Sequence, residues 1–178
     1  QITEEMEEYF PDMDQMLFHL PLVGHTFKKS YFDTVLRRIT STFVQGADLV
    51  VDSDATSLET ALRTTETLRM STQRYNEYVH ADFYLDVENP SGSNTGDVAT
   101  IPQEIEGVSP GTALESESVV LLECHCYLDI ESKKGEPDKP FIVTYFEDTE
   151  KVVSIRRNWT EASSNEFKKE TWYVSYKF

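Results

Sequence analysis

Between Val120 and Ile130 apolar and polar side chains alternate, and this pattern constrains the fold more than any other feature of the sequence. One face of the predicted strand carries Val120, Leu122, Cys124, Cys126, Leu128 and Ile130. The opposite face carries Glu123, His125, Tyr127 and Asp129. Because successive side chains of a strand point to opposite faces, the pattern predicts a strand whose aliphatic face packs into a core.

Further strands are expected in the rest of the C-terminal third. Phe141–Phe146 and Val152–Trp159 flank Glu147–Glu150, which is the layout of a β-hairpin. A last strand is predicted at the C-terminus, where one face carries Trp172, Val174, Tyr176 and Phe178. We therefore expect residues 119–178 to form an antiparallel β-meander.

The N-terminal part is expected to begin with helix. Residues 1–20 carry apolar side chains at helical spacing. Pro11 is expected to divide or kink this helix, and Pro21 with Gly24 to end it.

Residues 25–88 are predicted to hold short strands and one more helix. The β-prone runs are Phe27–Phe32, Thr40–Val44, Leu49–Val51 and Thr64–Met70. Ser71 is suited to cap a helix whose apolar face carries Tyr75, Tyr78, Val79 and Phe83. A helix-rich part with short strands over 1–88, followed by the meander, predicts a single compact α+β domain.

The charge of the chain is strongly acidic. Sixteen Lys and Arg stand against 32 Asp and Glu, a net charge of −16, which disfavours binding to nucleic acid or to anionic lipid. Residues 89–118 are rich in Gly, Pro and acids and are expected to form a long, flexible surface loop. The basic residues occur in pairs that we expect to be solvated or to meet an acidic neighbour: Lys28-Lys29, Arg37-Arg38, Arg156-Arg157 and Lys168-Lys169.

Two clusters of residues contain groups that could act chemically. In a strand the thiols of Cys124 and Cys126 point away from His125, so the three cannot close on one metal ion, and we expect both thiols to be packed with raised pKa values. Asp129, Glu131 and Lys133 have the spacing of some metal-dependent nucleases, but the surface lacks the basic character that such an enzyme needs. We therefore predict no catalytic residue, no metal ligand and no cofactor.

The run Arg156-Arg157-Asn158-Trp159 is the most promising surface segment. An Arg beside an aromatic side chain is enriched in protein interfaces. We take Arg156, Arg157 and Trp159, together with Arg37 and Arg38, as candidate subunit contacts. The longest unbroken apolar run, Val119–Leu122, is far short of the ~20 residues that span a bilayer, and no membrane partner is expected.

Seven segments, in the same order, resemble the P22-like bacteriophage (or prophage) portal proteins. They are Met16–Asp33, Gln45–Val51, Glu104–Pro110, Leu121–Asp129, Phe141–Thr144, Val153–Trp159 and Tyr173–Phe178. The chain departs from that family at Thr34–Ile39, where family members usually turn with Pro and Gly. This departure leaves the geometry of the turn open.

The resemblance implies a structural role in the virion. Portal subunits form a dodecameric ring at one capsid vertex, through which double-stranded DNA is packaged and later ejected. The implied partners are other portal subunits, capsid protein, the terminase and tail adaptors, with assembly in the host cytoplasm. The matched stretch would be the outer wing of a subunit and is not expected to bind DNA specifically. The chain starts at Gln1 rather than Met, as expected for a piece of a longer protein.

Two other classes of function stay open at this point. One is a small metal-dependent nuclease or thiol hydrolase built on Asp129, Glu131 and Lys133 or on Cys124. The other is a free-standing acidic α+β binding module whose loop 89–118 recruits a basic partner.

Overall fold

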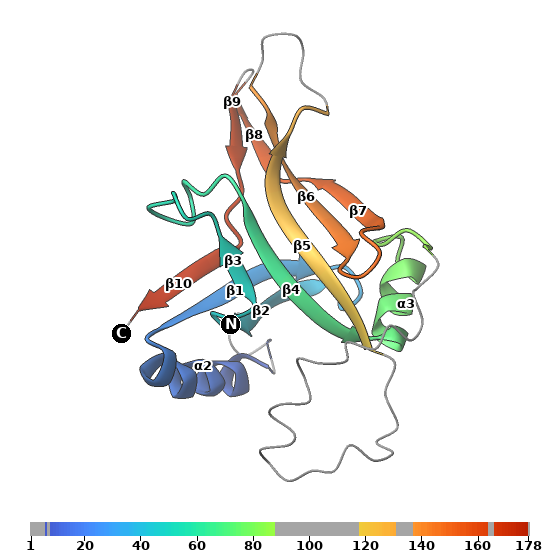
Figure 1. Cartoon of the computed structure of the whole chain (residues 1–178). Coiled ribbons are helices and arrows are strands. Elements are labelled where there is room, and N and C mark those ends of the chain that lie inside the picture. The colour runs from blue at the N-terminus through green and yellow to red at the C-terminus, as the bar shows by residue number, and fades with distance from the viewer. Residues whose placement is uncertain (1–5, 7, 88–117, 131–136, 164–165, 178) are drawn as a thin grey trace.

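The described residues form three antiparallel sheets and two helices, which confirms the α+β class. The computed structural model describes residues 6, 8–87, 118–130, 137–163 and 166–177 (Figure 1). The acidic segment 89–118 lies outside the described residues, except for Ser118.

The largest sheet has five strands in the order β3-β4-β5-β6-β7. Its strands are β3 (Leu49–Val51), β4 (Thr64–Ser71), β5 (Ser118–Leu128), β6 (Lys139–Phe146) and β7 (Val152–Arg157). The predicted hairpin is β6–β7, and the strands predicted near residues 49, 64, 120 and 141 are confirmed. Each strand from β3 to β7 pairs with the next strand along the chain, so this sheet is an antiparallel meander.

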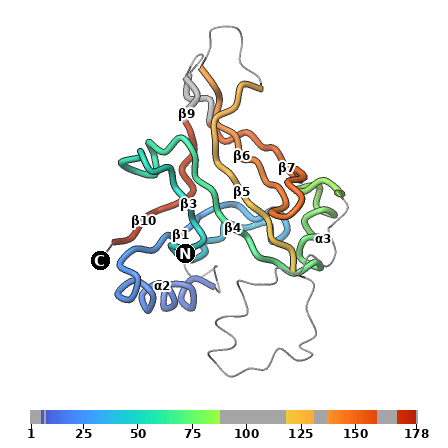
Figure 2. The backbone as a smooth tube through the Cα atoms, viewed as in Figure 1, coloured from blue at the N-terminus to red at the C-terminus, as the bar shows by residue number. Residues whose placement is uncertain are grey.

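The second sheet pairs the last strand of the chain with the first two, in the order β10-β1-β2. It consists of β1 (His25–Asp33), β2 (Arg38–Val44) and β10 (Tyr173–Lys177), and Figure 2 shows β10 running beside β1. The last strand therefore pairs with β1 and does not extend the C-terminal meander. Its buried residue is Tyr173, whereas Val174, on the face predicted to be internal, is 52% exposed.

Two short strands were not distinguished in the sequence. β8 (Trp159–Ser163) and β9 (Glu166–Lys169) pair as a separate two-stranded sheet beyond the end of β7 (Figure 1). Asn158, which is 1% exposed, lies between β7 and β8, and its backbone N–H donates to the carbonyl of Pro140.

Helix α2 (Tyr9–Val23) forms an outer layer against β1 and β2 (Figure 1). Pro11 lies in the first turn, where a missing N–H is harmless, so it does not divide the helix as predicted. Pro21 lies inside the helix, so the prediction that this proline helps to end the helix is wrong. Gly24 does end the helix, with φ of +76° and its N–H donating to the carbonyl of Leu20.

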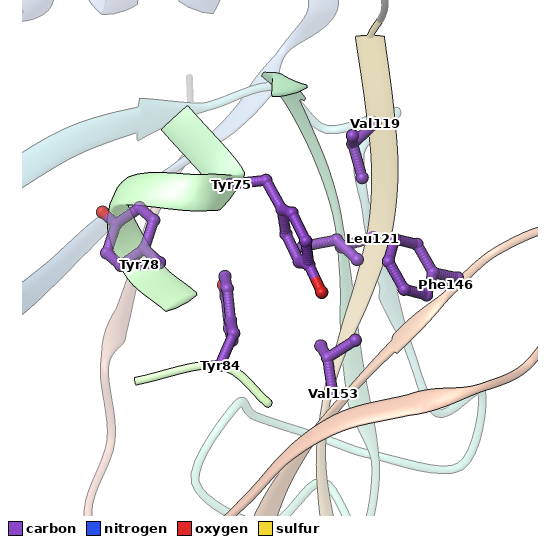
Figure 3. Packing of buried hydrophobic residues seen from close by; sticks show 7 residues of the cluster. All are labelled: Tyr75, Tyr78, Tyr84, Val119, Leu121, Phe146 and Val153. Carbon is purple, nitrogen blue, oxygen red and sulfur yellow. The ribbon is translucent and has the colours of Figure 1, made fainter. Parts of the chain in front are cut away.

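Helix α3 (Thr72–His80) covers one end of the five-stranded sheet. Ser71 caps it as predicted, since its side chain accepts a hydrogen bond from the Arg74 N–H at 3.2 Å. Tyr75 and Tyr78 point into a core that also contains Val119, Leu121, Phe146, Val153 and Tyr84 (Figure 3).

The buried face of β5 is the opposite of the one predicted. Val119, Leu121, Glu123 and His125 are the side chains that face the core and the second sheet. The predicted core face is only partly buried, and Val120, Leu122 and Cys126 are half-buried. The error has a physical cause: Val119 and Leu121 make both faces apolar at the start of the strand, and the polar residues that follow are buried with partners.

The turn between β1 and β2 is tight despite the absence of Pro and Gly. The Asp33 carboxylate accepts hydrogen bonds from the N–H groups of Val35 and Leu36, at 2.8 and 2.9 Å. Arg37 takes the left-handed backbone region that glycine usually fills, with φ of 53°. Asp33 thus supplies the turn chemistry in a connection that contains neither Pro nor Gly.

Candidate functional site: a buried ion cluster between the sheets

Two adjacent lysines of β1 hold the layers of the molecule together. Lys28 and Lys29 are each 4% exposed, and they point to opposite faces of the strand. Lys28 faces α2 and pairs with Asp12 at 2.9 Å. Lys29 faces the five-stranded sheet. Of the two alternatives predicted for this pair, the second holds, because each buried ammonium meets an acidic neighbour and neither is solvated.

Lys29 bridges two carboxylates that lie side by side. Glu66 of β4 and Glu123 of β5 are direct partners in the strand register. Like charges at such positions repel. The Lys29 Nζ lies 2.5 Å from Glu66 Oε2 and 2.8 Å from Glu123 Oε1, so one cation neutralises the repulsion and links the sheets.

Tyr173 and His125 complete the hydrogen bonding of these carboxylates. The Tyr173 hydroxyl donates to Glu66 Oε2 at 2.8 Å. His125 Nε2 lies 3.0 Å from Glu123 Oε1, and because a carboxylate only accepts, Nε2 carries the proton in this arrangement. The side-chain amide of Asn158 lies 3.5 Å from His125 Nδ1, on the other side of the ring.

Arg156 of β7 closes the cluster on the side of α3. Its Nη2 donates to Glu123 Oε2 at 3.2 Å. The guanidinium also lies 4.1 Å from the ring centre of Phe83 and 5.6 Å from that of Trp172. Two cations, Lys29 and Arg156, therefore balance the two carboxylates, Glu66 and Glu123.

The pKa values follow from this arrangement. Burial alone would lower the pKa of Lys29, but the charges of Glu123 and Glu66 outweigh it and raise that pKa. Burial would raise the pKa of Glu123, but Lys29, His125 and Arg156 hold it well below its usual range. Burial and the two carboxylates raise the pKa of Tyr173. At neutral pH Lys29 is therefore a cation and Glu123 a carboxylate, while the Tyr173 hydroxyl keeps its proton.

A small pocket of about 80 Å³ lies beside the cluster. Its walls include Tyr31, Asp33, Phe83, Tyr84, Arg156 and Trp172. It has room for a few water molecules. The charged groups that line it are already paired. Lys29 and Arg156 both bind Glu123. Asp33 accepts from the Tyr78 hydroxyl at 2.8 Å and pairs with Arg74 at 3.2 Å.

The chemistry that this arrangement favours is cohesion between the sheets. Glu123 and His125 are 3% and 2% exposed, and their polar atoms are engaged with internal partners. Within the described residues no group of three or more His, Cys, Asp or Glu side chains is placed to hold a metal ion.

The structure places the predicted contact residues in different settings. Arg156 is turned into the cluster, while Arg157 is exposed and lies over the half-buried Trp159, 5.6 Å from its ring centre. Arg37 is exposed in the β1–β2 turn, and Arg38 pairs with Glu8. Arg157 and Trp159 are the two candidates that the structure brings together.

The other predicted sites are also separated. Cys124 and Cys126 share one face of β5 and His125 the other, as expected. A hydrogen bond from Cys126 lowers the pKa of the Cys124 thiol, contrary to the expected rise, while the same bond raises that of Cys126. Asp129 is exposed after β5, whereas Glu131 and Lys133 lie outside the described residues.

The sequence reasoning missed Lys29, Glu66 and Tyr173 as members of one cluster. Two signals were available. A lysine pair inside a β-prone run puts one ammonium on the inner face whatever the register, and Glu66 is a lone acid within the apolar and Thr-rich strand β4.

No protein-family model and no curated protein matches the chain. Neither described helix has the length and apolar character needed to cross a membrane.

Proposed function

We propose that this chain is a structural part of a phage portal subunit, forming its outer wing, with no chemical step of its own. The proposal rests first on the seven ordered segments that resemble portal proteins. The observation that carries it in the structure is apolar surface that a subunit would bury against its neighbours. On α2 the side chains of Phe10, Leu17, Phe18 and Leu22 share one side of the helix and are 54–69% exposed.

The rigid core supports the same reading. α2 is fastened through Asp12, which pairs with Lys28 and accepts from the Phe43 N–H at 2.5 Å. His19 stacks on Phe43, with the ring centres 5.3 Å apart. The exposed side of the helix is therefore presented in a fixed orientation, which lowers the entropic cost of association.

The outer face of the five-stranded sheet adds a second partly apolar surface. Val50, Thr65, Cys124, Val143 and Ile155 form one row across all five strands by register. Val50 and Ile155 at its ends are 60% and 52% exposed. A wing that contacts neighbouring subunits on one side and capsid protein on another would use two such surfaces.

Assembly of the portal subunit to which we assign this chain tests the proposal. Sedimentation velocity would compare the wild type with Phe18→Ser on α2 and with Leu62→Ser, a matched change at a side chain that is 66% exposed in the β3–β4 connection. We expect Phe18→Ser to lower the assembled fraction and Leu62→Ser to leave it unchanged. Equal effects of both changes, or a wild type that never assembles, would overturn the proposal. Arg157→Ala and Trp159→Ala belong in the same series.

A further inference from the structure

The two cysteines of the chain lie together on the partly open face of β5. Cys124 is 8% exposed and Cys126 is half-buried. Both point to the outer face of the sheet, away from the ion cluster, and one thiol donates a hydrogen bond to the other. They are therefore a pair of neighbouring sulfurs that can be reached from outside through Cys126.

Two cationic side chains flank the pair. The charge of Arg63 acts to lower the pKa of both thiols, but at Cys126 the hydrogen bond with Cys124 and burial outweigh it, so the pKa of Cys126 is raised while that of Cys124 is lowered. Lys169 acts on Cys126 in the same direction; its Nζ is fixed by donation to the Ala61 carbonyl at 2.8 Å. Thr65, the register partner of Cys124, donates a further hydrogen bond to that sulfur. Two cations beside two sulfurs offset the negative charge that deprotonation creates.

A disulfide does not fit this geometry. Cys124 and Cys126 are two residues apart on one face of a strand, so their backbone positions, and the Cβ atoms that project from them side by side, are roughly 6.4–6.8 Å apart along the strand. A disulfide needs its two Cβ atoms about 3.5–4.5 Å apart. β5 cannot shorten to reach that distance, because it is paired to β4 through Cys124 and to β6 through both Cys124 and Cys126.

A single soft ion held between the sulfurs fits better. Two metal–sulfur bonds of about 2.3 Å in line would place the two sulfur atoms roughly 4.6 Å apart. The two cysteine side chains can bring their sulfurs to that distance by rotating towards each other, without a change in the strand backbone. A tetrahedral zinc site needs further ligands, and the described part of the chain offers no third His, Cys, Asp or Glu at this place. Soft monovalent ions such as Cu(I) prefer thiolate ligands, and two suffice for linear coordination.

We propose that Cys124 and Cys126 form a two-coordinate thiolate site for a soft monovalent cation of the Cu(I) type. Binding forms two metal–sulfur bonds and releases to solvent whatever protons the two thiols still carry, with no change in oxidation state. The product carries one negative charge, which Arg63 and Lys169 offset. The site is separate from the ion cluster and does not depend on the proposed portal function.

The test is a titration of the reduced chain with Cu(I) under argon, in competition with the chromogenic chelator bicinchoninate. We expect one Cu(I) per chain. Loss of either sulfur should weaken binding about 100-fold or more, because the chain then offers only one sulfur and the gain from a second ligand on the same molecule is lost. Cys126→Ser is the primary variant, since its side chain is half-exposed and the change spares the core. Cys124→Ser is the second, and Val174→Ser is the control, at a side chain of β10 that is 52% exposed and belongs to the other sheet.

Each outcome decides the matter. One ion per chain, lost in Cys124→Ser and Cys126→Ser and retained in Val174→Ser, supports the site. Binding that survives Cys126→Ser, one ion shared by two chains, or complete removal of Cu(I) from the wild type by the chelator would overturn it. Circular dichroism of each variant separates loss of the site from loss of the fold.

Discussion

Replacing Lys29 with methionine should be one of the most damaging single changes in this protein. The change keeps the length and apolar stem of the side chain but removes the ammonium between Glu66 and Glu123. The two carboxylates then face each other at direct partner positions in adjacent strands. Each is at most 6% exposed, so water cannot replace the lost cation.

The size of the effect follows from the distances. At 2.5 and 2.8 Å from the two carboxylates, Lys29 gains roughly 6 kcal/mol of attraction from each at an effective dielectric constant of about 20. Desolvation of the ions offsets much of this gain. Removing one partner of a buried ion pair costs about 3–5 kcal/mol of unfolding free energy, and we expect a loss in that range.

Urea unfolding followed by circular dichroism measures this loss at pH 7. The triple variant Lys29→Met, Glu66→Gln, Glu123→Gln should recover much of it, because no unpaired charge remains. The loss in Lys29→Met should also shrink towards pH 4, where one carboxylate can take up a proton. A loss below about 1 kcal/mol, or a loss independent of pH, would refute the reasoning.

Three further outcomes are expected. The pKa of Glu123 is lowered in the folded state, so the stability that this carboxylate contributes is complete above its ordinary pKa near 4.5 and is lost as the pH falls below that value. The unfolding free energies of the wild type and of Glu123→Gln should therefore converge between about pH 5 and pH 2. A difference between them that stays constant with pH would contradict this. Ser71→Ala removes the cap of α3 and should cost about 1 kcal/mol, with Ser71→Thr as the conservative control in the same urea assay. Gly24→Ala forces a side chain into a left-handed residue with open space around it, so backbone strain alone should lower the unfolding free energy by about 1 kcal/mol, and an unchanged midpoint would show that the residue relaxes.

Local patterns predicted the elements of this fold better than their faces. The strands near residues 27, 40, 64 and 141 and the Ser71 cap follow from β-prone runs and capping chemistry, which act over a few residues. The inner face of β5 does not follow, because Glu123 becomes an internal residue only once Lys29 from another sheet is beside it. A carboxylate with a buried cationic partner breaks the rule that apolar faces point inwards.

Pairing between distant segments was the second limit. Nothing local to Tyr173 indicates that β10 will leave its neighbours in sequence and join β1, since that pairing is set by the packing of two whole sheets. The ion cluster depends on the same event, because it draws Lys29, Glu66, Glu123 and Tyr173 from four strands. The exposed Arg157 beside Trp159 could be singled out from sequence because the two residues are close along the chain.

Negative-stain electron microscopy of the portal subunit to which we assign this chain tests the central proposal most directly. The account predicts rings with a central hole, in which the side of α2 that carries Phe18 faces a neighbouring subunit. Small monomeric particles at every concentration would contradict it.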